Sequence, residues 1–273
     1  MKITFLGGGN MANALIGGLL KQGAKPGNIT VLELDPVSRQ RLIDNYGVTC
    51  LATADASAWC ADIIVLAVKP QQMQAALQTL TPHLANQIVV SIAAGLRLDT
   101  LSRWLGSFRR IVRAMPNTPA MIGAGVTGLC AYPEVSASER QAAESILHAV
   151  GSTLWVEDEA QMDAITAISG SGPAYVFLFI EALQHAAEKL GFQPEAARQL
   201  ALQTFTGAAS LAAQTGENLV LLRQRVTSKG GTTEAALQAM LAGGIQETIL
   251  AGALAANARS IELGKLLDQE GHQ

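Results

Sequence analysis

Over the first part of the chain, short apolar runs alternate with segments of helical periodicity. The runs predict buried strands at Met1–Leu6, Ile29–Glu33, Asp62–Val68, Gln87–Ile92, Arg110–Met115, Gly125–Cys130 and Thr153–Val156. Helical spacing follows Gly9 at Met11, Leu15 and Leu19, and it recurs over Val37–Tyr46, Gln71–Leu80 and Ser138–Val150. Strands that alternate with helices at this pace predict an α/β fold with a Rossmann-like, doubly wound parallel sheet.

Beyond Glu157 the strand pattern disappears. A single helical spacing links Val176, Ile180, Leu183, Ala187 and Leu190. The segments Leu200–Leu211 and Ile245–Ala256 are apolar on more than one face, which a lone small bundle could not bury. We therefore expect a nucleotide-binding domain over 1–157 and an all-helical domain over 158–273 that packs against another copy of itself.

Composition excludes several classes of protein. The 273 residues are 49% hydrophobic and 15% charged, which is typical of a globular protein. The net charge is −3, and no Lys/Arg cluster lies beside aromatic residues, so we expect no nucleic-acid partner. No uninterrupted apolar run reaches the ~18 residues of a membrane span. The sequence therefore favours a cytoplasmic protein without a membrane partner.

Cysteine and histidine are too scattered for a metal site. The three cysteines, at 50, 60 and 130, lack C-x-x-C spacing and are expected to be ordinary reduced residues. The four histidines are equally dispersed, so we expect no metal.

The first predicted strand runs directly into a G-x-G-x-x-A motif. Gly7 would allow a tight turn, Gly9 a close approach to a pyrophosphate, and Ala12 close packing of the helix on the sheet. The free N–H groups at the start of the helix would then face phosphates. The alternatives are a plain strand-to-helix turn and a related domain that has lost its ligand.

The end of the second strand would contact the adenosine ribose. Here the acids Glu33 and Asp35 suit the 2′-hydroxyl of NAD, whereas Ser38, Arg39 and Arg41 suit the 2′-phosphate of NADP. Either set of residues could instead have only a structural role, so the sequence leaves the choice between NAD and NADP open. Lys69, at the end of another strand, would touch the nicotinamide ribose or simply end that strand.

Three later segments combine small or hydroxyl-bearing residues with a following helix or turn: Met115–Pro119, Ser169–Tyr175 and Val226–Glu234. Each alone could be a capped loop. In the last, Gly230 and Gly231 expose N–H groups beside Ser228, Thr232 and Thr233, a nest that suits a small carboxylate.

With these motifs the chain resembles the pyrroline-5-carboxylate reductases, which complete proline biosynthesis. The resemblance rests on the glycine motif together with Ala67–Pro70, Ser91–Gly95, Arg113–Pro119, Ser169–Tyr175 and Gly230–Glu234. It implies hydride transfer from NADPH, with NADH as the alternative donor, to the C=N carbon of 1-pyrroline-5-carboxylate, giving L-proline. It also implies homodimers, often assembled into decamers, with the substrate pocket at the subunit boundary.

The resemblance also implies roles for individual residues. The pyrophosphate would be held by Leu6, Gly7, Gly8, Gly9, Asn10 and Met11, and the nicotinamide side lined by Lys69, Ala93 and Ala94. The substrate carboxylate would be bound by Ser228, Gly230, Gly231 and Thr232. Thr233 would hydrogen-bond the ring nitrogen as a positioning group or proton relay, since a cyclic imine is basic enough to need no strong enzymatic acid. At the ribose, the candidates retained are Asp35 and Arg39.

Two departures and two rival functions bear on this assignment. Many relatives carry proline at position 229, where this chain has Lys229, and NADPH-preferring relatives differ at Leu34-Asp35. A β-hydroxyacid dehydrogenase would carry a lysine near the start of the long helix, but residues 163–181 contain none. A nucleotide-sensing protein without turnover would be expected to have a damaged substrate loop, yet residues 230–233 keep the Gly-Gly-Thr-Thr motif.

Overall fold

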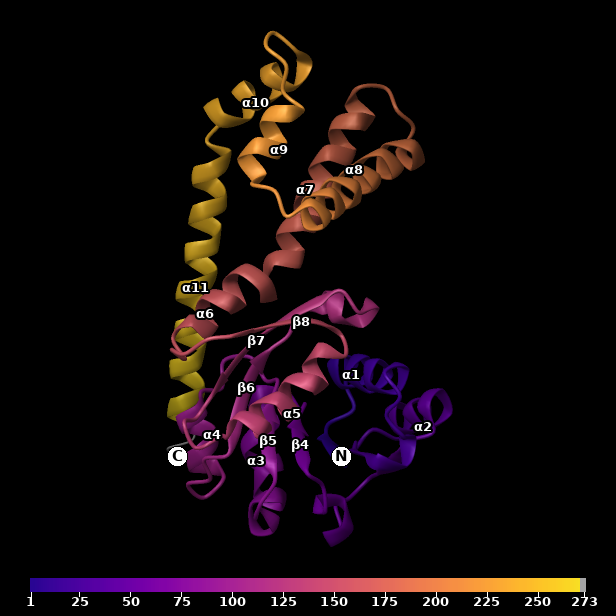
Figure 1. Ribbon diagram of the computed structural model, residues 1–273, viewed down its shortest axis with the longest axis vertical. Coiled ribbons are helices and arrows are strands. Elements are labelled where there is room, and N and C mark those ends of the chain that lie inside the picture. The colour runs from indigo at the N-terminus through magenta and orange to yellow at the C-terminus, as the bar shows by residue number, and fades with distance from the viewer. Residues whose placement is uncertain (271–273) are drawn as a thin grey trace. The chain divides into compact units, whose positions relative to one another are not determined.

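The computed structural model describes residues 1–270, with Ser57 and Glu270 described by backbone alone. The chain forms two compact units (Figure 1). Unit 1 comprises Met1–Ser171 and the C-terminal segment from Ala256, and unit 2 comprises Gly172–Ala255. The units therefore divide the chain differently from the predicted boundary at residue 157, which remains a prediction about domain organisation.

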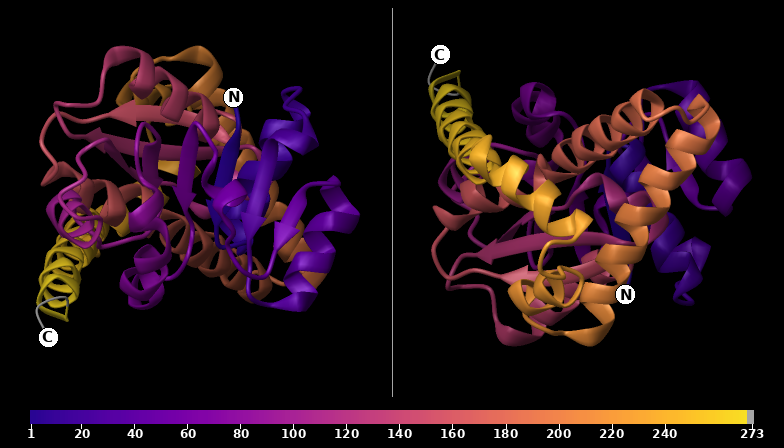
Figure 2. Two further views of the ribbon diagram at one scale, coloured as in Figure 1. Left: turned by 90° about the horizontal axis from the view of Figure 1, so that it is seen from below. Right: turned by 90° about the horizontal axis from the view of Figure 1, so that it is seen from above.

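Unit 1 is built on one eight-stranded sheet in the order β3-β2-β1-β4-β5-β6-β7-β8. Figure 2 shows helices on both sides of its strands. The reversal of strand order at β1 and β4 creates the switch point where ligands bind in doubly wound sheets. The strands are β1 (Ile3–Leu6), β2 (Ile29–Leu32), β3 (Thr49–Leu51), β4 (Ile63–Leu66), β5 (Ile88–Ser91), β6 (Ile111–Met115), β7 (Gly125–Ala131) and β8 (Gly151–Trp155).

The predicted helices of this unit are present, with small shifts at their ends. In α5 the first turn is fixed by a capping box, in which Ser136 and Glu139 bond each other's backbone N–H. The helices are α1 (Asn10–Lys21), α2 (Pro36–Tyr46), α3 (Pro70–Leu80), α4 (Leu98–Trp104), α5 (Ala137–His148) and α6 (Gln161–Ile165).

Two short elements escaped the sequence analysis. Strand β3 has three residues on the sheet edge, and α4 has seven residues. Both are shorter than the window over which a hydrophobic period can be recognised. Their formation depends on the neighbours that they pack against.

The sheet is parallel from β3 to β6, but β7 runs antiparallel to β6 and parallel to β8. The predicted doubly wound parallel sheet is therefore confirmed for most of its strands, and the β6–β7 pair is the exception. Only residues 116–124 connect β6 to β7. A parallel crossover needs about a dozen residues or more, so this connection can only reverse the chain. Helix α5 then supplies the longer crossover from β7 to β8.

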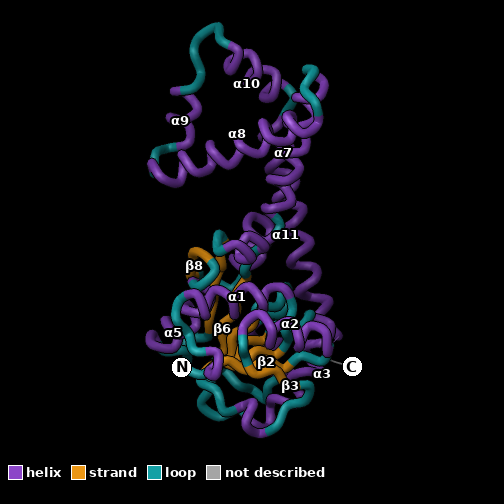
Figure 3. The backbone as a smooth tube through the Cα atoms, turned by 90° about the vertical axis from the view of Figure 1, so that its right-hand side faces the viewer, coloured by secondary structure: helices purple, strands orange, loops and turns teal. Residues whose placement is uncertain are grey.

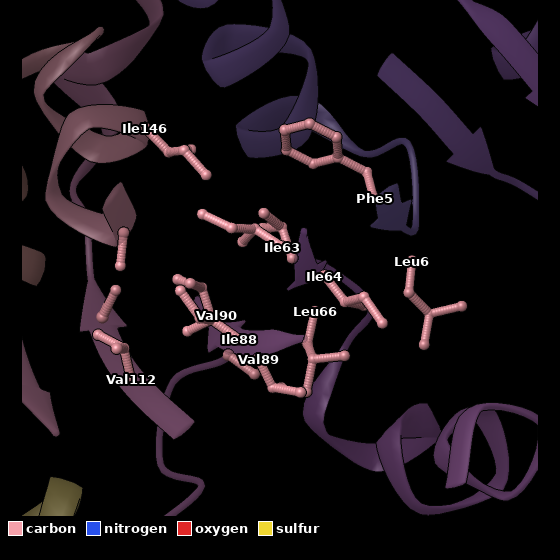
Figure 4. Close-up of a cluster of buried hydrophobic side chains, with 14 of the residues drawn as sticks. Phe5, Leu6, Ile63, Ile64, Leu66, Ile88, Val89, Val90, Val112 and Ile146 are labelled. Carbon is pink, nitrogen blue, oxygen red and sulfur yellow. The ribbon is translucent and has the colours of Figure 1, made fainter. Parts of the chain in front are cut away.

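The central strands are buried on both faces, which is why they read as continuous apolar runs. Every residue of β1, β4 and β5 is buried. Figure 4 shows Phe5, Ile63 and Ile146 within this core, so side chains of β1 and β4 meet the helix α5. Apart from Thr4, whose hydroxyl donates to the Ala58 carbonyl oxygen at 2.6 Å, the polar side chains lie at or beyond the ends of these three strands.

The C-terminal part of α11 (Ile245–Glu270) belongs to unit 1. The buried Ser260 hydroxyl donates to Asp163 of α6 at 2.6 Å. Near the end of the helix, Asp268 accepts hydrogen bonds from Thr100 and Arg103 of α4, each at 2.6 Å. These bonds fasten the last helix to the unit that carries the sheet.

Unit 2 is helical throughout, as the sequence predicts and Figure 3 shows. Besides the first part of α11 it contains α7 (Gly172–Lys189), α8 (Pro194–Thr215), α9 (Leu219–Arg225) and α10 (Thr232–Ala242). Within α7 to α10, only Ala197 and Ala201 are buried. Large apolar side chains are exposed instead, among them Phe177, Leu178, Leu190, Leu211, Leu219, Leu250 and Leu254.

By length and composition alone, the helical stretch Gln161–Lys189 is apolar enough to cross a membrane. The bent pair Thr232–Ala242 and Ile245–Gln269 would be a second span. The core helix of a soluble protein passes the same test, so this is weak evidence for a membrane protein. The absence of a membrane partner stays a prediction.

Gly151 starts β8 at a point where a side chain cannot fit. Its φ is +151°, and a Cβ there would lie 1.9 Å from the carbonyl oxygen of Gly125 on β7. We expect Gly151→Ala to lower the free energy of unfolding by about 2 kcal/mol or more, because the backbone of β7 must shift. Gly27→Ala, which meets nothing within 4 Å, is the matched control and should change the melting temperature little. Equal melting temperatures for the two variants would contradict this packing.

Candidate active site

The backbone turns out of β1 at Gly7. This residue has φ +104°, a conformation that favours glycine, and a Cβ there would lie 2.8 Å from the carbonyl carbon and oxygen of Ala67. The turn therefore passes directly over the end of β4. Hydrogen bonds from Gly7 N–H to Leu32 and from Ala67 N–H to Leu6 fix the ends of the three strands together, both at 2.8 Å.

Gly8 is held against the end of β2. Its N–H donates to Glu33 Oε2 at 2.7 Å, and a Cβ at Gly8 would lie 2.7 Å from Leu42 of α2. The other oxygen of Glu33 accepts from Asp35 N–H at 2.9 Å. One carboxylate thus joins the glycine loop to the β2–α2 loop.

Gly9 is the N-cap of α1, and no side chain caps this helix. A Cβ at Gly9 would meet nothing within 4 Å. The first N–H groups of a helix lack partners inside it, so the start of α1 can bind an anion. Asn10 is exposed there, whereas Met11 is half-buried against the core. The loop from Leu6 to Met11 therefore leaves room beside the first amides of α1, and its role in binding a pyrophosphate stays a prediction.

A cleft of about 1050 Å³ opens beside this loop. From the glycine loop and β2 it is lined by Leu6, Gly7, Gly9, Glu33 and Asp35, and from the β4 side by Ala67, Val68 and Lys69. It continues past Gln72 and Ala76 of α3 to Trp59 and His83, whose rings stack at 6.3 Å. The cleft borders the carboxyl ends of β1, β2 and β4, at the switch point where dinucleotides bind in such sheets.

At the ribose end, both retained candidates also have structural roles. Asp35 caps α2 by accepting from Ser38 N–H at 2.8 Å, and hydrogen bonds from the Ser38 hydroxyl and amide lower the pKa of Asp35. Arg39 Nη1 donates to the carbonyl oxygens of Glu33 and Leu34 at 2.8 and 2.7 Å. Their roles as cofactor ligands remain predictions.

Three sequence motifs lie at the ends of β4, β5 and β6, which are parallel and therefore end at one edge of the sheet. Lys69 follows β4 as the N-cap of α3 and lines the cleft. After β5, Ala93 is buried and Ala94 is exposed, and the next residue, Gly95, has φ +80°. The nicotinamide side of the predicted site thus rests on neighbouring strands.

Asn117, in the motif after β6, joins two segments that the sequence analysis treated separately. Its amide nitrogen donates to the Ser169 carbonyl and hydroxyl oxygens at 3.3 and 3.2 Å, and its oxygen accepts from Val126 N–H at 2.9 Å. Residues Thr166–Gly170 form a π-helical turn, a feature often found at functional sites. The buried Asn117 side chain therefore fixes the turn that precedes α7.

The predicted carboxylate nest lies in unit 2. Gly231 is the N-cap of α10, and Gly230 has φ +74°. The amide of Gly230 donates to Glu234 at 2.6 Å, and that of Gly231 to the Ser228 carbonyl at 3.0 Å. Ser228 and Thr232 are exposed and Thr233 is half-buried. The glycine turn expected from the sequence is present. Two of its amides donate to acceptors within the chain, so the donors that remain for a ligand are the hydroxyls and the first amides of α10.

The structure groups the predicted residues into two sets, one around the cleft of unit 1 and one at the turn of unit 2. It adds Glu33, which the sequence analysis weighed but did not retain. Its place directly after β2 was the available signal, and its bond to Gly8 became visible only in three dimensions. Among the described residues, no three His, Cys, Asp or Glu side chains are arranged to hold a metal ion.

Comparison with known proteins agrees with this geometry. A family profile described as pyrroline-5-carboxylate reductase dimerisation matches residues 159–263, and one described as coenzyme F420-dependent NADP oxidoreductase matches residues 2–95. The pyrroline-5-carboxylate reductase of Pseudomonas aeruginosa is 44% identical, over 98% of this chain and 98% of that protein. The chain belongs to the pyrroline-5-carboxylate reductase family.

Solved structures of this reductase family share the fold. The enzyme from Coxiella burnetii superposes with a TM-score of 0.90 at 43% identity, covering 96% of this chain and 98% of that one. The Plasmodium falciparum enzyme, solved with NADP bound, gives 0.84 at 30% identity, covering 97% and 98%. The family resemblance and the Rossmann-like fold with a helical C-terminal part are thereby confirmed.

Gly9 offers a test of the pyrophosphate site in this member of the reductase family. We expect Gly9→Ala to reduce dinucleotide affinity about tenfold or more, because the added methyl group occupies the space that the pyrophosphate would approach. The melting temperature without nucleotide should fall by no more than a few degrees, since nothing lies within 4 Å of that Cβ. Calorimetric titration with NADH and NADPH, beside Gly27→Ala as control, measures the effect. Unchanged affinity would place the pyrophosphate elsewhere.

Proposed function

We propose that the protein reduces 1-pyrroline-5-carboxylate to L-proline with a reduced nicotinamide dinucleotide as hydride donor. The observation that carries this proposal is the near-full-length similarity to pyrroline-5-carboxylate reductases, at 44% identity. The structure supports it with a cleft at the switch point of the sheet and an intact Gly-Gly-Thr-Thr turn. Residues 1–157 would bind the dinucleotide and residues 158–273 would supply the substrate groups and the dimer contacts.

The residues of the cleft fit a dinucleotide. The first N–H groups of α1 would hold the pyrophosphate, and Lys69, Ala93 and Ala94 would border the nicotinamide end. The bound dinucleotide supplies the hydride. What the chain supplies is orientation, since holding two reactants in register removes much of the entropic barrier.

Substrate recognition would depend on the turn of unit 2. The hydroxyls of Ser228 and Thr232 and the first amides of α10 can donate to a carboxylate, with the positive end of the helix dipole adding to the attraction. In the turn itself Glu234 accepts from Gly230, so a substrate carboxylate that used this amide would have to displace it. Thr233, one position into the helix, would place its hydroxyl at the ring nitrogen.

The proton on the imine needs no dedicated acid from this chain. A cyclic imine is basic enough to be protonated in water, and the resulting positive charge makes its carbon a better hydride acceptor. Thr233 would then hold the N–H in place while the hydride is transferred.

The activity predicts that purified protein oxidises NADH or NADPH only when 1-pyrroline-5-carboxylate is added, with L-proline as the product. Thr233→Ala should lower kcat about tenfold or more while leaving dinucleotide affinity unchanged, because the hydroxyl acts mainly in the reacting complex. Thr233→Ser, which keeps the hydroxyl, should recover most of the rate. Initial rates and chromatographic detection of proline measure both. Absence of proline with either dinucleotide would refute the function.

The proposal includes self-association through the helical unit, with dimers that assemble further into decamers in the cytoplasm. Apolar side chains exposed on α7 and α8 support it, since surfaces of this kind usually mark an interface. The Phe177 side chain, for example, is 65% exposed in a single chain.

Light scattering at micromolar concentration should accordingly give the mass of a dimer or of a multiple of it, with no folded monomer. Phe177→Glu should weaken the assembly because it buries a charge in the contact. Ile122→Glu, at a residue 84% exposed on unit 1, is the matched control and should leave the mass unchanged. A monomeric mass for the unaltered protein would contradict the proposal.

A further inference from the structure

We infer that Glu33 is the residue that recognises the adenosine ribose, and that it makes this protein prefer NADH to NADPH. The inference deepens the proposed function and rests on it for the identity of the reaction. It starts from the position of Glu33, which directly follows β2 and lines the cleft beside the glycine loop. In dinucleotide-binding sheets an acid at this position accepts hydrogen bonds from the ribose hydroxyls of NAD.

The Glu33 carboxylate is held in place by two backbone amides. Gly8 N–H donates to one oxygen at 2.7 Å and Asp35 N–H to the other at 2.9 Å. A carboxylate can accept about four hydrogen bonds, so each oxygen keeps a lone pair for a ribose hydroxyl. Rotation of the side chain out of the cleft would leave both amides without these partners. The negative charge is therefore a fixed part of the ribose site.

Asp35, the candidate retained from the sequence, is a weaker choice. Its carboxylate caps α2 and bonds both the amide and the hydroxyl of Ser38. It is also exposed, so water competes for its remaining lone pairs. Glu33 is half-buried and bonds the glycine loop directly, which places it nearer to the expected position of the ribose.

The groups that could hold a 2′-phosphate are tied to the backbone of the β2–α2 loop or lie on another face of α2. Ser38 bonds Asp35, and Arg39 donates through Nη1 to two carbonyl oxygens of the same loop. Arg41 lies two positions further along α2, about 200° around the helix from Arg39, so it cannot reach the same point. Leu34, between the two acids, is 83% exposed and offers no polar group.

The charges that line the cleft also favour NADH over NADPH. Among the described residues that line it, Glu33 and Asp35 carry negative charge at the β2 end, and Lys69 is the one with a permanent positive charge. Lys69 follows β4, two strand spacings or about 10 Å from β2. A 2′-phosphate at the β2 end would meet like charges, whereas a 2′-hydroxyl would find acceptors.

The test measures dissociation constants of NADH and NADPH by calorimetry, and kcat/KM for each with 1-pyrroline-5-carboxylate, on the full chain. For the unaltered protein we expect both ratios to favour NADH by about tenfold or more. Glu33→Gln removes the charge but keeps a carbonyl acceptor, and it should lower the NADH preference about tenfold. If the substitution only loosened the loop, it would weaken the binding of both dinucleotides equally and leave the ratio of their affinities unchanged.

Two further variants serve as a charge control and as a test of the rival residue. Asp44→Asn removes a charge of the same sign from the exposed face of α2, where Asp44 accepts a hydrogen bond from Gln40, and should leave the ratio unchanged. Asp35→Asn tests the rival residue, because asparagine still caps a helix. A ratio that moves with Asp35 and not with Glu33 would overturn the assignment, as would a preference of the unaltered protein for NADPH.

The binding measurements test the role of Glu33 independently of the proposed reaction. Tighter binding of NADH without reduction of 1-pyrroline-5-carboxylate would support the role of Glu33 while refuting the activity. If Glu33→Gln does not fold, the affinities of the unaltered protein still decide the preference.

Discussion

The backbone of β1 leaves the sheet at Gly7 so close to Ala67 that no side chain fits between them. That contact sets the arrangement of the nucleotide-binding unit. Because β1 and β4 are buried on both faces, a polar side chain along them needs an internal partner, as Thr4 has in the Ala58 carbonyl oxygen, and only the strand ends can present polar groups to a ligand. The tight turn then aims α1 back across the sheet and leaves its first amides beside the cleft.

The same turn explains why one carboxylate has so large a role. Gly8 lies against the end of β2. Its N–H needs a hydrogen-bond acceptor, and the Glu33 carboxylate provides one. The bond that completes the loop also fixes the Glu33 carboxylate beside the cleft, where we infer the ribose site. Under the inferred assignment, the same side chain would both stabilise the loop and select the cofactor.

The helical unit differs from the nucleotide-binding unit in how few side chains it buries within one chain. The apolar faces of its helices provide the area for association with another copy. The turn before α10 keeps its glycines because Gly230 adopts a left-handed conformation, and a Cβ at Gly231 would lie 2.5 Å from Ser228 Oγ. Local sterics thus favour glycine in the turn that is predicted to bind the carboxylate, on a unit that buries few side chains by itself.

The sequence by itself determined the strand–helix alternation, the glycine turn, the helical second half and the family, because these depend on local periodicity and on motifs of fixed spacing. It did not show the reversed strand β7, the short elements β3 and α4, the hydrogen bonds from Asn117 to Ser169, or the different partners of Glu33 and Asp35. Those depend on which chain segments meet. Glu33 and Asp35 look equivalent in sequence, and only the fold shows that Glu33 bonds Gly8 at the end of the neighbouring strand while Asp35 caps α2.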